Sequence, residues 1–149
     1  MSEAGERPRR LEPPVTDTSE PFWEATRRRR LLMQWCVDCG HAVFFPRDVC
    51  PRCLGSRLEW RPSAGTGSVH TYTVEHNPQN PNLTAPYTIA LIDLDDGVRM
   101  MSNVVGCPPD EVRVGMRVAV TWEELSDGRN LPLFEPAGPT PGASSPSVV

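Results

Sequence analysis

The sequence predicts a mainly β protein in which a short helix, a small cysteine-containing sheet and a closed barrel follow one another. Three observations lead to this prediction. Four cysteines form two Cys-x-x-Cys pairs, Cys36–Cys39 and Cys50–Cys53, with ten residues between the pairs. A short stretch that can form a helix precedes them and contains Phe22 and Trp23. From residue 65 onward, segments rich in strand-forming residues alternate with turns that contain glycine or proline.

The two cysteine pairs have the spacing of a closed metal site. Two residues between cysteines let both sulfurs point into one tight turn, and two such turns supply four thiolates at tetrahedral positions, which Zn²⁺ prefers. A site with four protein ligands has no open position for water, so it stabilises structure and does not catalyse. The sequence therefore predicts a structural zinc site with four ligands: Cys36, Cys39, Cys50 and Cys53.

Three other interpretations of these cysteines remain open. Iron also accepts four tetrahedral sulfurs, and spacing alone does not separate an iron-containing electron carrier from a zinc site. Two disulfides would suit a secreted chain, but the N-terminal residues lack the apolar core of a signal peptide. A redox-active Cys-x-x-Cys pair normally acts alone at the start of a helix, which makes it the least favoured interpretation.

The predicted helix spans about residues 19–29, with Thr18 or Ser19 as its cap. It contains too few apolar residues to be stable in isolation. Its Phe22-Trp23 pair must therefore pack against another surface. That surface is either the rest of this chain or a partner protein, and the sequence favours neither.

The strand pattern predicts two β-structures. Around the cysteine pairs, three short strands alternate with the two turns, as in a zinc ribbon: 31–35, 41–45 and 57–60. After Gly65, five segments separated by turn residues predict five strands: 68–75, 87–94, 98–105, 117–123 and 131–134. Five short strands over about 70 residues favour a small closed barrel of the OB-fold type. A β-sandwich fits less well, because about seven strands are expected there.

These patterns divide the chain into four regions. Residues 18–62 hold the helix and ribbon, and residues 63–136 hold the OB-fold. Residues 1–17 are polar and proline-rich and residues 137–149 are small or polar, so both are predicted to be disordered tails. No run approaches the ~20 apolar residues of a membrane span. We expect a cytoplasmic protein, because free thiols persist in that compartment.

Composition excludes several functions. All 15 basic residues are arginine, so Schiff-base chemistry, pyridoxal-phosphate catalysis and a phosphate-binding loop with its lysine are excluded for this chain alone. The net charge of −4 argues against nucleic-acid binding. The basic run Arg27–Arg30 is interpreted as a solvated helix end. A single-stranded nucleic-acid module remains the alternative function, with Tyr72, Tyr87 and Trp122 as candidate stacking residues.

No catalytic residue is predicted. Cys107 is the fifth cysteine, and a catalytic cysteine needs an activating neighbour such as histidine. His70 and His76 occur in the same half of the chain, but the sequence places neither beside Cys107. We interpret Cys107 as a thiol without a chemical role.

The combination of helix, ribbon and barrel resembles one family. It is the acyl-CoA-associated family with a rubredoxin-like zinc ribbon and an OB-fold, known as domain of unknown function thirty-five. One departure is Arg28-Arg29, where a glycine-containing turn is expected. The resemblance covers about residues 19–136 and is carried by matching stretches: Pro21-Phe22-Trp23, 31–36, Cys39-Gly40-His41, Pro46, 50–53, 65–69, Thr71-Tyr72-Thr73, Pro86-Tyr87, 95–99, Val114-Gly115-Met116 and 131–134.

The resemblance implies a subunit that is not catalytic by itself but is required by a thiolase-like enzyme, either an aldolase (a lyase) or an acyltransferase. Members of the family bridge two acyl-CoA enzymes in an archaeal mevalonate route. In actinobacteria they pair with a thiolase-like aldolase, a lyase that acts on CoA thioesters in steroid side-chain degradation. The arginine-only composition hints at a GC-rich bacterial genome and favours the second setting. The resemblance also implies CoA near the ribbon and barrel, without naming contact residues, and Phe22 and Trp23 are the candidate partner-binding residues.

Overall fold

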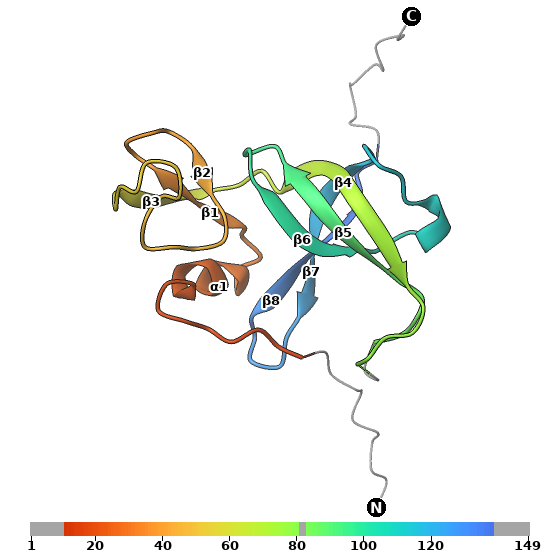
Figure 1. The fold of residues 1–149 in the computed structure, drawn as a ribbon. Helices are drawn as coiled ribbons and strands as arrows, with labels where there is room; N and C mark the ends of the chain where they lie inside the picture. The colour runs from red at the N-terminus through yellow and green to blue at the C-terminus, as the bar shows by residue number, and fades with distance from the viewer. Residues whose placement is uncertain (1–10, 81–82, 139–149) are drawn as a thin grey trace, which may run out of the picture.

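One short helix and two β-structures follow one another along the chain (Figure 1). The computed structural model describes residues 11–80 and 83–138. The outer parts of the two predicted tails, residues 1–10 and 139–149, lie outside the described residues. Within the described ranges, no helix is long and apolar enough to cross a membrane. The predicted fold class, with one short helix, a four-cysteine ribbon and a closed barrel of five strands, is confirmed.

The first β-structure is a three-stranded antiparallel sheet. Its central strand β1 (Leu32–Cys36) pairs with β2 (Ala42–Val43) on one side and with β3 (Leu58–Pro62) on the other. The strand β2 is shorter than predicted. The buried Gln34 amide instead holds the chain beyond it, because Gln34 Nε2 donates to the Arg47 carbonyl oxygen and Oε1 accepts from the Arg47 N–H.

The second β-structure is a closed five-stranded barrel with the strand order β4-β5-β6-β8-β7. Neighbouring strands are antiparallel except for β6 and β8, which close the barrel in parallel. A 3₁₀ turn, η1 (Pro109–Glu111), lies between β6 and β7. The barrel strands are β4 (Thr66–Glu75), β5 (Tyr87–Leu94), β6 (Arg99–Val104), β7 (Arg117–Glu124) and β8 (Asn130–Pro136).

The long strand β4 closes the barrel because it pairs with two neighbours. Its register against β5 shifts between Val69 and Thr71, and its first residues also pair with β7. A bulge of this kind bends a strand and increases its twist. Gly67 permits the close approach of β5, because a Cβ atom there would lie 2.4 Å from the Asp93 carbonyl oxygen. The Gly65-Thr66-Gly67 sequence therefore marks a packing requirement.

The helix α1 (Glu20–Thr26) connects the two β-structures by contacting both β1 and β8. It ends earlier than predicted. The N–H of Arg30 donates to the Ala25 carbonyl oxygen and that of Arg29 to Thr26, which is the pattern of a Schellman C-cap. Arg29 occupies the position that normally takes glycine, with φ of 55°. The departure from the family pattern at Arg28-Arg29 thus falls on a left-handed turn.

One hydrophobic core extends from the barrel to the helix and part of the ribbon. Inside the barrel it contains Ile92, Val118 and Phe134, and α1 and β1 contribute Phe22 and Met33. The cysteine end of the ribbon has a separate small cluster: Cys36, Val43 and Cys50, with Cys39 and Leu58 packed against it. In Figure 1 the ribbon lies beside the barrel, with α1 below the small sheet. The barrel and part of the ribbon therefore share one core, and the buried residues of the cysteine end form a cluster separate from it.

Candidate functional site

The four sulfur atoms predicted as metal ligands lie together at one end of the ribbon sheet. Each Sγ atom lies within 4.8 Å of the other three. The Cys36 and Cys53 sulfurs are 3.5 Å apart, and those of Cys39 and Cys50 are 3.6 Å apart. Tetrahedral sulfurs about 2.3 Å from a Zn²⁺ ion lie roughly 3.8 Å from one another, whereas disulfide sulfurs lie about 2.05 Å apart. The arrangement fits a metal ion and not disulfides.

The electrostatics of this cluster also fit a cation. Hydrogen bonds from backbone N–H groups, first that of Cys53 and then that of Arg52, lower the pKa of Cys50 to about 7. Burial, followed by hydrogen bonds with Cys36 and Cys50, raises the pKa of Cys39 to about 12. Four neighbouring sulfurs are therefore not all thiolates by themselves. A dication among them would favour the thiolate form of each.

The absence of a side chain at Gly55 leaves room beside the sulfurs. A Cβ atom on Gly55 would lie 3.3 Å from the Cys53 Sγ atom and 3.0 Å from a carboxylate oxygen of Asp38. The Gly55 carbonyl oxygen also accepts a hydrogen bond from the Cys50 N–H. The second cysteine turn is therefore closed by its own backbone, and a larger side chain at Gly55 would crowd the sulfurs.

The remaining thiol and the histidines do not form a catalytic pair. Burial, and then the charges of Glu111 and Asp110, raise the pKa of Cys107, so its thiolate is disfavoured. His70 lies on the barrel surface, where its Nδ1 atom is 3.1 Å from Asp93 Oδ2. Cys107 is a free, partly buried cysteine, and the contacts of the His70 ring are with Arg99 and Asp93.

Phe22 and Trp23, the candidate partner-binding residues, pack mainly against this chain. They are 5% and 9% exposed, and their rings meet edge to face with centroids 5.1 Å apart. The Arg129 guanidinium covers the Trp23 ring, 4.9 Å from its centroid, a favourable cation–π geometry. Phe22 also contacts Phe44, at 6.3 Å between ring centroids. The pair therefore fixes α1 between the ribbon and the barrel.

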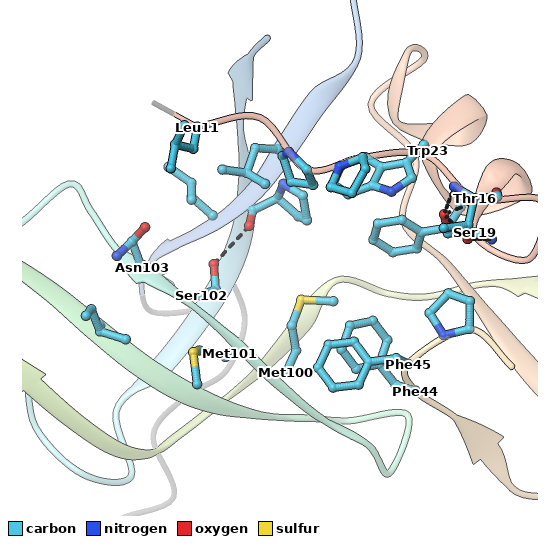
Figure 2. A pocket seen from close by; sticks show the side chains of 18 of the residues that line it. Leu11, Thr16, Ser19, Trp23, Phe44, Phe45, Met100, Met101, Ser102 and Asn103 are labelled. Carbon is cyan, nitrogen blue, oxygen red and sulfur yellow. Dashed lines mark hydrogen bonds between the residues drawn. The ribbon is translucent and has the colours of Figure 1, made fainter. Parts of the chain in front are cut away.

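An apolar groove with a volume of about 700 Å³ lies beside this pair. Phe44 and Phe45 form its ribbon wall, while Met100 and Met101 of β6 form part of its barrel wall (Figure 2). The third wall is a segment that we call the strap, residues 11–16, which belongs to the predicted tail 1–17. The sequence pattern does not predict this groove. The pair Met100-Met101 is the sequence feature that could have indicated it. Neighbouring side chains on a strand point to opposite faces, so one of these two methionines must face outward.

The candidate stacking residues do not form a nucleic-acid surface. Tyr72 and Trp122 are partly buried against the barrel core, and Tyr87 is also partly buried and lines the apolar groove. Residues 63–136 carry four arginines and ten acidic residues. Single-strand binders combine stacking aromatics with a positively charged groove, so no specific feature favours this alternative.

A four-cysteine ribbon followed by a closed barrel of five strands defines a class, the zinc-ribbon OB-fold proteins. Family models agree with this class. The model described as "ChsH2, rubredoxin-like zinc ribbon domain" matches residues 23–59, and "ChsH2, C-terminal OB-fold domain" matches residues 60–123. The chain belongs to the DUF35 family, the family that its sequence resembles.

Individual relatives differ in length and in name. The chain is 38% identical over 136 residues to a "Probable enoyl-CoA hydratase alpha subunit" of Thermomonospora curvata, covering 90% of this chain but only 43% of that protein. It is 30% identical over 115 residues to a "DUF35 domain-containing scaffold protein" of Methanothermobacter thermautotrophicus, covering 76% and 86% of the two chains. Among solved structures, "Ltp2-ChsH2(DUF35) aldolase" matches with a TM-score of 0.78 and 35% identity, covering 85% of this chain and 100% of that one.

Proposed function

We propose that this chain is a non-catalytic subunit that binds a thiolase-like enzyme acting on acyl-CoA thioesters. The observation that carries the proposal is the match to a chain of a solved structure titled "Ltp2-ChsH2(DUF35) aldolase", which is covered over its full length. The name of the methanogen relative, a scaffold protein, supports the same role. The partner would supply the bond-breaking groups, and this chain would support its active site and contribute to CoA binding.

We also propose that Cys36, Cys39, Cys50 and Cys53 hold one Zn²⁺ ion. The mutual distances of the four sulfurs and the zinc-ribbon family model over residues 23–59 support this assignment. A zinc ion with four thiolate ligands has no open position for substrate. Its role would be to fix the ribbon.

The nature of the substrate is a narrower proposal. We expect an acyl-CoA cleaved by an aldolase, and the family resemblance favours a steroid side-chain thioester. A hydratase is the second candidate partner, because the Thermomonospora relative is named as the alpha subunit of a probable enoyl-CoA hydratase. Both candidates act on CoA thioesters, so the two differ in the partner and not in the class of ligand.

Affinity purification of the tagged full chain from its source cell tests the proposal. We expect a thiolase-like protein to be identified by mass spectrometry among the proteins that remain bound, in constant ratio to the chain. The purified chain alone should not cleave or hydrate acyl-CoA thioesters, and the reconstituted pair should. A chain that turns over a thioester by itself would contradict the proposal. Recovery of a hydratase instead of a thiolase-like protein would select the second candidate.

A further inference from the structure

The apolar groove is lined without any charged side chain, although charged residues make up 23% of the sequence. Its deep surface is formed by buried side chains such as Trp23, Met100 and Leu133. Three residues on its rim are large and exposed: Leu11 at 82%, Met101 at 66% and Phe45 at 61%. A carboxylate, phosphate or ammonium group would find no opposite charge there. The lining therefore selects an uncharged occupant.

Two polar side chains at the groove, those of Ser102 and Asn103, already donate hydrogen bonds to the chain itself. The Ser102 hydroxyl donates to the Pro132 carbonyl oxygen at 2.9 Å (Figure 2). Asn103 Nδ2 donates to the Thr88 carbonyl oxygen at 2.9 Å. An occupant would therefore be held by burial of apolar surface more than by hydrogen bonds. A hydrocarbon group is the kind of ligand that binds in this way.

The strap is fixed from outside the groove. Both carboxylate oxygens of Glu12 accept hydrogen bonds from Ser126, one from its N–H and one from its hydroxyl, each at 2.7 Å. Arg129 donates to the Pro13 carbonyl oxygen at 2.8 Å while it covers the Trp23 ring. The strap is thus anchored to the residues that connect β7 to β8 without any ligand. A preformed cavity of about 700 Å³ is in the size range of small-molecule sites, about 300–1,000 Å³.

We propose that the apolar groove binds the uncharged hydrocarbon part of a small-molecule ligand, with any charged part of the ligand outside. The ring-rich ribbon wall and the flexible methionines of β6 suit a bulky apolar body. The identification of this ligand as the acyl group of a CoA thioester rests on the proposed function. The proposal that the chain alone binds a hydrocarbon group does not depend on the proposed function.

Nile red, an uncharged apolar dye, tests the groove in the full-length purified chain. We expect saturable binding at one dye per chain. Met101→Asp places a carboxylate on the rim and should weaken binding about tenfold or more. Val114→Asp is the matched control, because Val114 is 67% exposed and lies outside the groove. Phe45→Asp repeats the test from the ribbon wall, and zinc content and circular dichroism confirm that each variant is folded.

Competition identifies the ligand class. Decanol and decanoyl-CoA should displace the dye, and free CoA should not, because CoA lacks the hydrocarbon group.

Absence of saturable dye binding, or equal weakening by Met101→Asp and Val114→Asp, would overturn the proposal. If Met101→Asp removes the enzyme partner but the wild-type chain binds no dye, the groove is a protein-docking surface and the ligand proposal is wrong. Displacement by decanol but not by decanoyl-CoA would overturn the acyl identification alone. A chain that binds dye but captures no partner would contradict only the proposed function.

Discussion

The ribbon and the barrel solve the same problem of stability by different means. The barrel buries large apolar side chains such as Ile92, Val118 and Phe134 on strands that pair all the way round. The cysteine end of the ribbon buries only a small cluster around Cys36, Val43 and Cys50. Small structural units of this kind usually need a metal or disulfides, because they cannot bury enough apolar surface. The ribbon is therefore expected to depend on its metal, whereas the barrel depends on its core.

The two regions also differ in charge. Residues 18–62 carry eight arginines and five acidic residues, while residues 63–136 carry four arginines and ten acidic residues. Barrel arginines are largely paired, as in Arg99–Asp93 and Arg117–Asp95. The two ranges therefore carry net charges of opposite sign when histidine is counted as neutral. The groove is lined by residues of both regions, and none of its lining residues is charged.

Loss of the metal is expected to give the largest effect and to separate the two regions. Cys50→Ser should reduce bound zinc from one ion per chain to almost none, because structural zinc contributes on the order of 10 kcal/mol to a folded site. Amide hydrogen exchange should become fast in residues 32–62 while strands β4–β8 keep most of their protection. Elemental analysis and exchange mass spectrometry measure both outcomes.

Cys107→Ser is the control for that substitution, because Cys107 lies outside the cysteine cluster. It should leave the metal content unchanged. Equal loss of protection in ribbon and barrel would show that the two unfold as one cooperative unit. It would contradict the statement that the ribbon depends on its metal and the barrel on its core. A red protein that contains iron and no zinc would contradict the zinc assignment.

A smaller effect is expected at the junction between the regions. Thr26 is completely buried; its hydroxyl donates to the Trp23 carbonyl oxygen and accepts from the Asn130 N–H. Thr26→Val keeps the shape but leaves the buried Asn130 N–H without this partner, which costs about 1–3 kcal/mol. Urea denaturation should show this loss. Thr71→Val, on the exposed side of β4, should change stability by less than about 0.5 kcal/mol. Equal effects of both substitutions would show that the junction bond is unimportant.

The sequence predicted the parts of the fold that depend on local patterns. Cysteine spacing identified the ribbon, and strand alternation with the Asp96-Gly97 turn identified the β5–β6 hairpin. The end of α1 was placed too late, because the left-handed turn at Arg29 does not carry the usual glycine. Local sequence patterns could not show which residues of the ribbon and the barrel contact each other.

Tertiary contacts explain what the sequence did not reveal about the groove. The strap reads as a polar, proline-rich tail, and its order depends on Glu12 meeting Ser126, more than 100 residues away. The sequence did not decide whether the Phe22-Trp23 pair packs on this chain or on a partner. The residues that the pair contacts, Arg129 and Phe44, are also distant in sequence. A groove between three segments is a product of folding, so composition and periodicity carry almost no sign of it.

The smallest predicted effect concerns the surface ion pair between Asp95 and Arg117. Hydrogen bonds from Arg117 and then from Thr66 lower the pKa of Asp95 to about 2 from its ordinary value of 3.8. A carboxyl with a lower pKa in the folded state contributes stability that is complete well above the unfolded pKa and is lost as the pH falls through the folded pKa. Both side chains are about half exposed, so Asp95→Asn should cost less than about 1 kcal/mol at pH 7.

Urea denaturation of wild type and Asp95→Asn at several pH values measures that contribution. The difference between the two should be constant above about pH 5 and should shrink as the pH falls from 4 toward 2, because protonation removes the charge of Asp95 in the wild type. It should also shrink in high salt, since both groups are exposed. In Arg117→Gln the Asp95→Asn substitution should cost less, because the partner is already gone. A difference that grows on acidification would contradict the assigned direction of the pKa shift.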